Sequence, residues 1–330
     1  MPIATVGTPF LWTVTLLGVL ALLVLDFIVT RKPHVVSLHE AIGWSAFYTA
    51  LPVAFGVWVW TSFGSEIGIE YYTGYLVEKS LSVDNLFVFM ILLAAFAVPR
   101  ALQQRALLFG VIGALVLRGI FIALGAQLIA SFSWAFLLFG IVLLVTGAKL
   151  LKDSLAGSDH ALEASEVRSV QLARRLFPVT EVYHGAALTV REGAGRALTP
   201  FALVVIAILG TDIVFAIDSV PAVYGITGDP YLVFVTNAFA LLGLRALYFV
   251  LEGALASLRY LGYGLSLILG FIGAKLVLHW AHTVWAPVPS IPTLPSLAVI
   301  VGILTATIVA SLLAKRAAAE QGVPTDADHA

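Results

Sequence analysis

Long apolar runs, separated by short polar connections, recur along the whole chain. A helix needs about 20 apolar residues to cross the hydrocarbon core of a membrane. A membrane-spanning barrel would show short segments of alternating hydrophobicity instead. The pattern predicts an all-α polytopic membrane protein with about nine transmembrane helices, numbered here as spans one to nine, at roughly 9–30, 41–63, 73–97, 104–128, 133–152, 200–222, 231–251, 261–284 and 296–314.

One connection, 153–198, is long and polar and contains no run that could span a membrane. It separates two groups of three spans. The predicted organisation is an N-terminal two-helix segment, a three-helix unit, a cytoplasmic loop, a second three-helix unit, and a last helix with its tail, at 1–72, 73–152, 153–198, 199–285 and 286–330.

Composition supports a membrane protein and excludes several kinds of chemistry. Hydrophobic residues make up 60% of the 330-residue chain and charged residues only 11%, whereas soluble domains carry about 25% charged residues. The chain has no cysteine, which excludes disulfides, thiolate metal ligands and thiol catalysis. No nucleophile–base pair and no His-Glu-x-x-His motif is found. We therefore expect no enzyme, no tightly bound cofactor and no nucleic-acid partner.

The basic residues predict an orientation. If the spans alternate, the Lys and Arg residues of the connections all fall on one side of the membrane, and that side is expected to be cytoplasmic. The N-terminus would then lie outside, with the C-terminus and the long loop inside. Only Lys79, Arg118 and Lys275 fall clearly within spans.

Two spans carry unusual groups of acidic and small polar residues. They are "VEKSLSVDNLFVF" (77–89) in span three and "GTDIVFAIDSVPAVYGIT" (210–227) in span six. Each group has two acids six residues apart, and the second acid is followed by a small polar residue: Glu78, Asp84 and Asn85, and Asp212, Asp218 and Ser219.

The similarity extends to the spans that follow. "ALVLRGIFIALG" in span four matches "ALLGLRALYFVLEG" in span seven, so Arg118 corresponds to Arg245. "GAKLLKD" in span five matches "GAKLVLHW" in span eight, so Lys149 corresponds to Lys275. Because spans three and six cross in opposite directions, spans 3–5 and 6–8 are predicted to be inverted repeats. Inverted repeats are a signature of secondary transporters.

Charge within a membrane needs compensation. Four acids at helix centres cost on the order of 10 kcal/mol in insertion free energy before they find partners. Six residues turn a helix by about 600°, so the two acids of one span point about 120° apart. Glu78, Ser82 and Asn85 share one stripe, whereas Asp84 faces elsewhere. Either spans three and six pack so that their acids converge, or span six breaks near Pro221 and frees carbonyl groups.

Carboxylate, amide, hydroxyl and carbonyl oxygens are hard ligands that suit manganese, magnesium and calcium. A divalent cation is therefore the expected cargo. The structural alternative is that the acids pair with basic residues and hold the bundle together, while a relay of protons between carboxylates is a further alternative. The candidate charge or gating partners are Ser82, Lys79, Arg118, Arg245 and Lys275.

Over roughly residues 40–315 the sequence resembles the TerC family of integral membrane proteins. "EKSLSVDNLFVF" and "TDIVFAIDSVPAVYGIT" resemble its two hallmark motifs, and "FPVTEVYHG" (177–185) resembles a family stretch in the long loop. The resemblance implies efflux of Mn(II) through the bacterial inner membrane, with a link to metal loading of exported enzymes and to tellurite resistance. The family is grouped with the LysE-type exporter superfamily.

Carried onto this chain, the resemblance implies a metal site made by Glu78, Asp84, Asn85, Asp212, Asp218 and Ser219. Asp84 and Asp218, which lie deepest in their spans, are the expected central ligands, with Glu78 and Asp212 as second ligands or gates. The family pattern has another acid just before "TD", where Leu209 and Gly210 stand here, and this departure bears on metal selectivity. Ca(II) and Mg(II) stay open as cargo beside Mn(II). Two other functions also stay open: a non-transporting membrane factor in tellurite resistance or protein insertion, and an exporter of small organic solutes.

Overall fold

The computed structural model describes residues 5–30, 36–132, 134–156, 168–192, 195–251, 260–285, 287–289 and 291–320. Its helices are α1 Pro9–Val29, α2 Leu38–Phe63, α3 Ser65–Ala95, α4 Arg100–Ser131, α5 Ala135–Ala156, α6 Arg168–Leu176, α7 Pro200–Tyr224, α8 Pro230–Leu242, α9 Leu244–Leu251, α10 Leu261–Val284 and α11 Thr293–Glu320. Two short strands, β1 Thr189–Glu192 and β2 Gly195–Leu198, form an antiparallel hairpin.

The all-α polytopic architecture is confirmed, and every predicted span lies on a helix. Within the described ranges, eight helical segments are long and apolar enough to cross a membrane. One of them, 230–250, joins α8 to α9 across Gly243. The 31-residue α3 is not among the eight; it carries Glu66, Glu70, Glu78, Lys79 and Asp84.

Several spans begin where local chemistry favours a helix start. Thr8, Thr199 and Asp229 each accept a hydrogen bond from a backbone N–H of the following turn, and each is followed directly by proline. Such side chains accept hydrogen bonds from the free backbone N–H groups at a helix start. Proline suits the first helical position because it has no backbone N–H group that would need a partner there. The sequence itself therefore fixes where α1, α7 and α8 begin.

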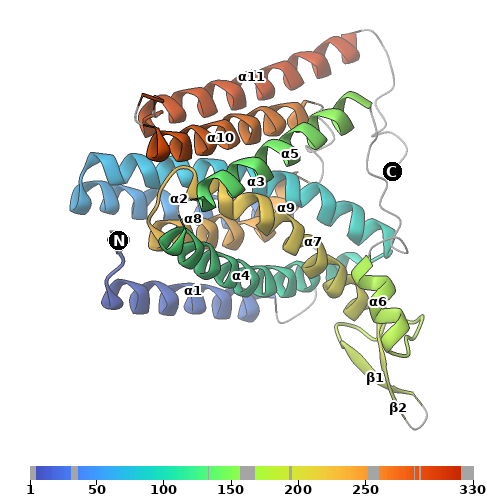
Figure 1. The fold of residues 1–330 in the computed structure, drawn as a ribbon. Coiled ribbons are helices and arrows are strands. Elements are labelled where there is room, and N and C mark those ends of the chain that lie inside the picture. Colours follow the sequence, from blue (N-terminus) through green and yellow to red (C-terminus); the bar gives the residue numbers. More distant parts are fainter. Residues whose placement is uncertain are drawn as a thin grey trace.

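The spanning helices form an elongated bundle (Figure 1). α10 and α11 lie on one side of it and α1 on the opposite side, while α3, α7 and α8 run through the middle. α3 packs against both α7 and α8, and α4 packs against the same two helices. α1 begins at one end of the bundle and α11 finishes at the other (Figure 1), as an odd number of crossings requires.

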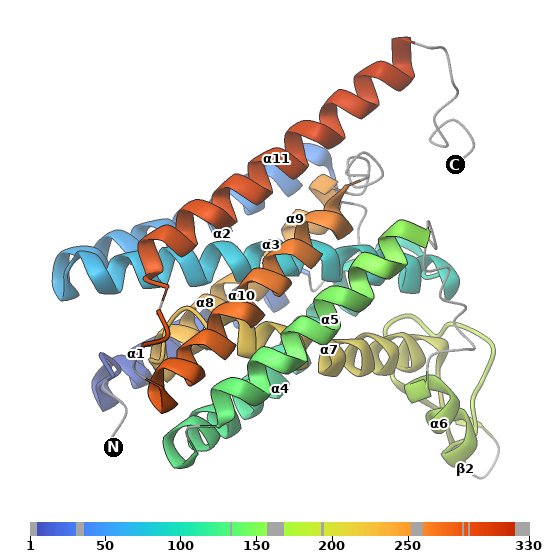
Figure 2. The ribbon, with the colours of Figure 1, turned by 45° about the horizontal axis from the view of Figure 1, so that its top comes forward.

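α5 and α10 form the closest helix pair and lie side by side (Figure 2). A Cβ added to Gly140 would lie 2.9 Å from the carbonyl oxygen of Gly273, and the reverse distance is also 2.9 Å. A Cβ on Gly147 would lie 3.0 Å from the carbonyl oxygen of Ser266. In the sequence match Gly147 corresponds to Gly273, so Gly140 corresponds to Ser266. The sequence match therefore converts the contact between Gly140 and Gly273 into the contact between Ser266 and Gly147. A twofold relation between the predicted repeats requires this pattern.

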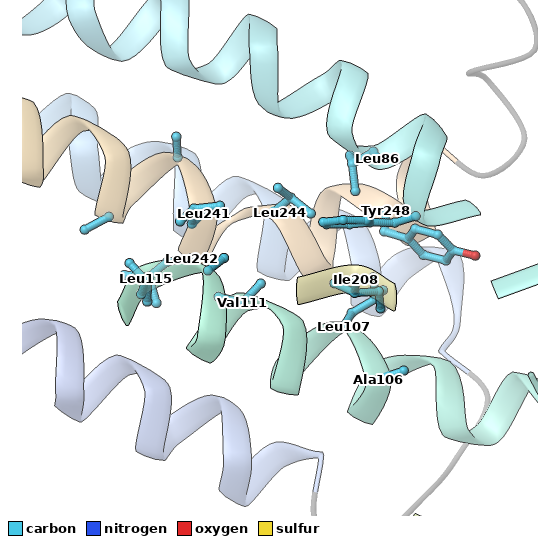
Figure 3. Close-up of a cluster of buried hydrophobic side chains, with 14 of the residues drawn as sticks. Leu86, Ala106, Leu107, Val111, Leu115, Ile208, Leu241, Leu242, Leu244 and Tyr248 are labelled. Carbon is cyan, nitrogen blue, oxygen red and sulfur yellow. The ribbon is translucent and has the colours of Figure 1, made fainter. Parts of the chain in front are cut away.

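The apolar core surrounds the middle of the bundle. Leu107, Val111 and Leu115 of α4 are buried with Ile208 of α7 and Leu241 of α8 (Figure 3). Side chains would not fit at two glycines of α4, because Ile208 and Leu209 already occupy the space beside Gly110 and Gly113. Close approach of this kind is how small residues let membrane helices pack.

The stretch 153–198, in which no spanning helix was predicted, contains α6 and the hairpin. Val170 and Ala173 of α6 are buried in the main core, and Leu198 pairs with Val179 in an isolated bridge. The Tyr183 hydroxyl donates to the carbonyl of Phe96 at the end of α3, at 2.7 Å. Burial around this hydroxyl raises the pKa of Tyr183 to about 12. This segment is therefore tied to the ends of the spans.

Candidate ion-binding centre

Four helices each place one polar side chain near the middle of the bundle. Glu78 comes from α3, Arg118 from α4, Asp212 from α7 and Asn237 from α8. All four side chains are buried, and Arg118 is only 1% exposed. A buried arginine needs acceptors for its N–H groups, so its surroundings define the centre.

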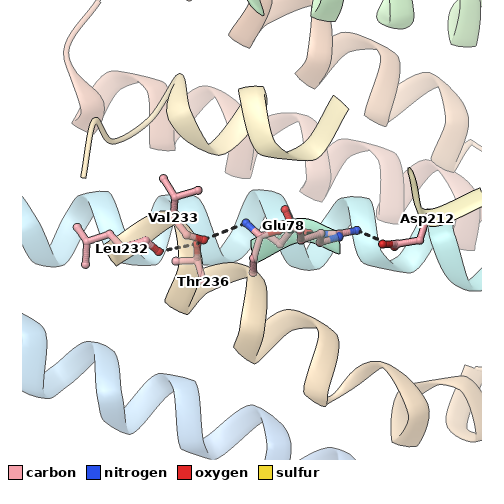
Figure 4. Close-up of polar contacts among 7 residues, drawn as sticks. Glu78, Asp212, Leu232, Val233 and Thr236 are labelled. Carbon is pink, nitrogen blue, oxygen red and sulfur yellow. Dashed lines mark hydrogen bonds and ion pairs between the residues drawn. The ribbon is translucent and has the colours of Figure 1, made fainter. Parts of the chain in front are cut away.

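Arg118 joins the two predicted repeats. Its Nη1 pairs with Glu78 Oε1 and donates to Asn237 Oδ1 at 2.9 Å, while its Nη2 lies 3.4 Å from Asp212 Oδ1. Figure 4 shows the line of polar contacts that runs past Glu78 to Asp212. Asn237 Nδ2 donates in turn to the carbonyl of Val233 at 3.0 Å.

Asn85 completes the acceptors around the guanidinium. With its amide turned so that both ends are satisfied, Oδ1 accepts from Arg118 Nη2 at 3.0 Å and Nδ2 donates to the carbonyl of Leu81 at 3.1 Å. Asn85 lies two turns after Glu78, on the stripe that helical geometry predicted. Glu78, Asn85 and Asp212 therefore meet at one place.

The centre is left with more negative than positive charge. Arg118 contributes one positive charge against the two carboxylates of Glu78 and Asp212. Glu78 Oε2 and Asp212 Oδ2 are buried and have no hydrogen-bond partner. An uncompensated buried carboxylate oxygen is costly, so this place favours a further proton, water or cation.

Two serine hydroxyls lie on the same stripes and are also unpartnered. Ser82 is one turn after Glu78, Ser219 is two turns after Asp212, and both are buried. Neither hydroxyl oxygen has a hydrogen-bond partner. Buried hydroxyls are usually paired, so these two groups add oxygen donors on the faces of α3 and α7 that carry the acids.

Asp218, another of the predicted acids, lies elsewhere. Asp218 is only partly buried, and its Oδ1 accepts from the Thr146 hydroxyl of α5 at 2.8 Å. Lys149, one turn further along α5, interacts with it electrostatically. Asp218 therefore lies against α5 and not at Arg118. Asp84 falls within α3, and its side chain lies outside the part of the chain that the structure describes.

Of the two arrangements expected from the sequence, helix packing is the one observed. α3 and α7 are in contact, and their acids converge on α4. Pro221 lies inside α7, which continues as a helix to Tyr224. Span six therefore does not break at the proline.

Arg245, the counterpart of Arg118 in the sequence match, occupies a separate centre. Its Nη2 pairs with Asp26 Oδ1 of α1 at 2.7 Å, and the Tyr48 hydroxyl of α2 donates to the same oxygen at 2.8 Å. All three side chains are buried. The sequence analysis gave Asp26 no role, although an acid inside an apolar run was a usable signal.

The two candidate lysines have contacts of their own. A Cβ at Gly243, between α8 and α9, would lie 3.0 Å from the Nζ of Lys79, so that ammonium group reaches the junction of the two helices. Lys275 of α10 interacts electrostatically with Glu70 of α3. The contacts of the two lysines are therefore with Gly243 and with Glu70.

Asn237 was missed by the sequence reasoning. It stands in "YLVFVTNAFALL" (231–242) as an amide within an apolar run, and such a residue inside a membrane needs a partner. Among the described residues, no group of three or more His, Asp or Glu residues is placed to hold a metal ion. The oxygen donors at the centre are instead two carboxylates, two amides and two nearby hydroxyls.

Comparison with known proteins identifies the family. The chain is 41% identical over 313 residues to an uncharacterized membrane protein of Myxococcus xanthus, covering 94% of this chain and 95% of that one. It is 42% identical over 322 residues to an uncharacterized membrane protein of Mycobacterium tuberculosis H37Rv, covering 94% and 81%. It is 38% identical over 316 residues to the Escherichia coli K12 protein named "Putative membrane-bound redox modulator Alx", covering 92% and 95%.

No solved structure matches the chain. The Integral membrane protein TerC family matches over residues 63–319, which include both acidic segments and the loop between the predicted repeats. The protein is a multi-pass membrane protein that belongs to the TerC family.

Proposed function

We propose that the protein exports a divalent cation, Mn(II), from the cytoplasm, and that the ion passes through the centre around Arg118. The observation that carries this proposal is the pair of unpartnered carboxylate oxygens, Glu78 Oε2 and Asp212 Oδ2. They belong to buried carboxylates on different helices, and the other oxygen of each carboxylate contacts the same guanidinium. Such groups in a membrane favour a transport function.

Arg118 acts as an internal counter-ion in this proposal. Without cargo, its guanidinium neutralises one of the two carboxylate charges. A divalent cation that enters the centre repels the guanidinium and takes over the carboxylates of Glu78 and Asp212. The arginine therefore releases the acids when the ion binds and holds them again when the ion leaves, so that neither state has a large uncompensated charge.

The donor set fits a hard divalent cation. Carboxylates, the amide oxygens of Asn85 and Asn237, and the hydroxyls of Ser82 and Ser219 are oxygen ligands, which suit Mn(II), Mg(II) and Ca(II). The choice of Mn(II) among these rests on the family resemblance. In this proposal Asp218, beside Thr146 and Lys149, serves as a second station for the ion or for a proton.

The test is manganese transport in membrane vesicles that contain the purified protein. A double variant, Glu78→Gln with Asp212→Asn, keeps the shape of both side chains and removes both charges. We expect transport to fall at least about tenfold, because the charges that bind the ion are gone. Glu66→Gln is the matched control, since it alters an exposed acid near the start of the same helix.

Retained transport in the double variant would refute the site. Absence of transport in the unmodified protein, with calcium and magnesium also tested, would refute the function. The second result would favour a non-transporting membrane factor.

A further inference from the structure

One face of α6 packs against α7. Val170 and Ala173 are buried, and the Ser169 hydroxyl donates to the carbonyl of Ile206 at 3.3 Å. Ser169 also occupies the space beside Gly210, where a Cβ would collide with it. α6 therefore covers α7 at Ile206 and Gly210.

The covered face of α7 continues as a lipid-facing stripe. Ile206, Gly210, Ile213 and Ile217 are spaced i, i+4, i+7 and i+11, so they lie along one side of the helix. Ile213 and Ile217 are 39% and 43% exposed, as apolar side chains of a spanning helix are when they face acyl chains. α6 thus occupies the end of a surface whose next turns contact lipid.

The length of α7 sets the depth of this contact. Its 25 residues rise about 37 Å, which exceeds the roughly 30 Å of hydrocarbon in a bilayer. Ile206 and Gly210 lie about 9 and 15 Å from the start of the helix. With α7 centred in the bilayer, the contacts of Ser169 are about 5 and 11 Å inside the hydrocarbon, within the leaflet where α7 begins. α6 lies at the end of the bundle where α7 begins (Figure 1).

The exposed part of α6 is amphipathic. Leu172 and Leu176, one turn apart, are 57% and 64% exposed. Arg174 and Arg175 are also exposed. A short helix with an apolar stripe beside basic residues is typical of helices that lie in a membrane interface.

The hairpin adds two more basic groups. Arg191 of β1 and Arg196 of β2 stand directly opposite each other in the register, and both are exposed. Like charges in this position destabilise a hairpin unless an anion lies between them. Both line an open hollow of the hairpin together with Thr189, Val190 and Gly195.

We propose that α6 and the hairpin dock on the cytoplasmic leaflet of the membrane. Leu172 and Leu176 enter the acyl region, and the arginines bind the phosphates of anionic lipid headgroups: Arg174, Arg175, Arg191 and Arg196. Charge complementarity and continuity with the lipid-facing stripe of α7 both favour lipid as the occupant. The proposal is independent of what the protein transports.

The absence of cysteine from the sequence allows a direct test with single labels. Leu172→Cys and Leu176→Cys are each labelled with a nitroxide in the full chain. The protein is reconstituted in vesicles of phosphatidylcholine alone or with one quarter phosphatidylglycerol. Collision rates with oxygen and with a water-soluble nickel chelate report depth. Ile213→Cys is the lipid-facing reference and Glu181→Cys the water-facing one.

We expect the oxygen-to-nickel ratio at both leucine positions to exceed that at Glu181 about fivefold or more in anionic vesicles, because an interfacial helix buries its apolar face. Changing all four arginines to glutamine should reduce that ratio toward the value in pure phosphatidylcholine. The unaltered label at Ile213 shows whether the variant still folds and inserts.

Three results would overturn the proposal. Both leucine positions could be as accessible to the nickel chelate as Glu181 in either lipid. Burial could be the same with and without phosphatidylglycerol or the arginines, which would remove the headgroup contact. The labels could be accessible in purified lipid but protected in native membranes, which would assign this face to a protein partner.

Discussion

The two buried arginines have similar places in the sequence match but different surroundings. Arg245 faces one carboxylate, Asp26, whose bonded oxygen also accepts from the Tyr48 hydroxyl. Arg118 faces two carboxylates, each with one oxygen that has no partner. A balanced pair has no need of a further ion, whereas the centre of Arg118 has two carboxyl groups for one guanidinium. The comparison separates an arginine in a paired contact from an arginine beside carboxylate oxygens that have no partner.

The origin of the partners explains the difference. Asp26 and Tyr48 belong to α1 and α2, which precede the predicted repeats. Glu78 and Asp212 come one from each repeat. The N-terminal helices therefore supply a fixed partner to Arg245. Arg118 receives no such partner and pairs with the acids at the interface of the predicted repeats.

The largest expected difference is in stability. Arg118→Met leaves two buried carboxylates unpaired and should lower the free energy of unfolding by about 3–5 kcal/mol. Arg245→Met should cost less, since Asp26 keeps the Tyr48 hydroxyl. Unfolding in mixed micelles measures both. Adding Glu78→Gln and Asp212→Asn to Arg118→Met should recover part of the loss. Equal costs for the two arginine variants would contradict the comparison.

Bound manganese should stabilise the fold through the centre around Arg118 and not through the centre around Arg245. At a concentration 100 times its dissociation constant, a ligand raises the free energy of unfolding by about 2.7 kcal/mol. We expect this gain in the unmodified protein and in Asp26→Asn, and its loss in Asp212→Asn. The measurement is the melting temperature with and without manganese, taken as a difference within each variant. A metal-dependent shift that Asp26→Asn abolishes and Asp212→Asn leaves unchanged would reverse the assignment.

A smaller effect is expected at Asn237. Asn237→Ala removes one acceptor of Arg118 and should cost about 1.5–3 kcal/mol, the range for hydrogen bonds to charged groups. Thr236→Ala is a neighbouring control, because the Thr236 hydroxyl donates only to carbonyls of its own helix. Unfolding in micelles again reports the difference, and a larger loss for Thr236→Ala would argue against a role for the amide.

The smallest effect compares two tyrosines. Tyr48→Phe removes a donor to a carboxylate and should cost about 1.5 kcal/mol or more, while Tyr183→Phe removes a donor to a carbonyl and should cost about 1 kcal/mol. The raised pKa of Tyr183, about 12, keeps its hydroxyl protonated in the fold. Its contribution is complete below about pH 10 and is lost as pH rises toward 12. Tyr183→Phe should therefore flatten the alkaline limb of a pH–stability curve.

Much of the fold follows from simple patterns in the sequence. The length of the apolar runs predicted the nine spans. The threonine–proline and aspartate–proline pairs mark where three helices begin. Helical spacing placed Glu78, Ser82 and Asn85 on one stripe. That inference needed only the angle by which an α-helix turns per residue, and tertiary contacts do not change this angle.

The pairing between distant segments could not be predicted in the same way. Asp26 meets Arg245 across 219 positions of sequence, and Asp218 meets Thr146 because of how α5 lies against α7. Neither follows from the spacing within one span. α6 and the hairpin are short and lie in a polar stretch, where periodicity gives a weak signal. The ligand roles of the six predicted residues remain predictions.

The complete burial of Glu78 and Asp212 has a consequence for the energised cell. A membrane potential of 100 mV drives each elementary charge with about 2.3 kcal/mol. A permanently water-filled path through this centre would let protons and metal ions flow across the membrane, driven by that potential. Because both acids are fully buried in this conformation, the centre does not form such a path, and we expect this conformation to conserve the membrane potential.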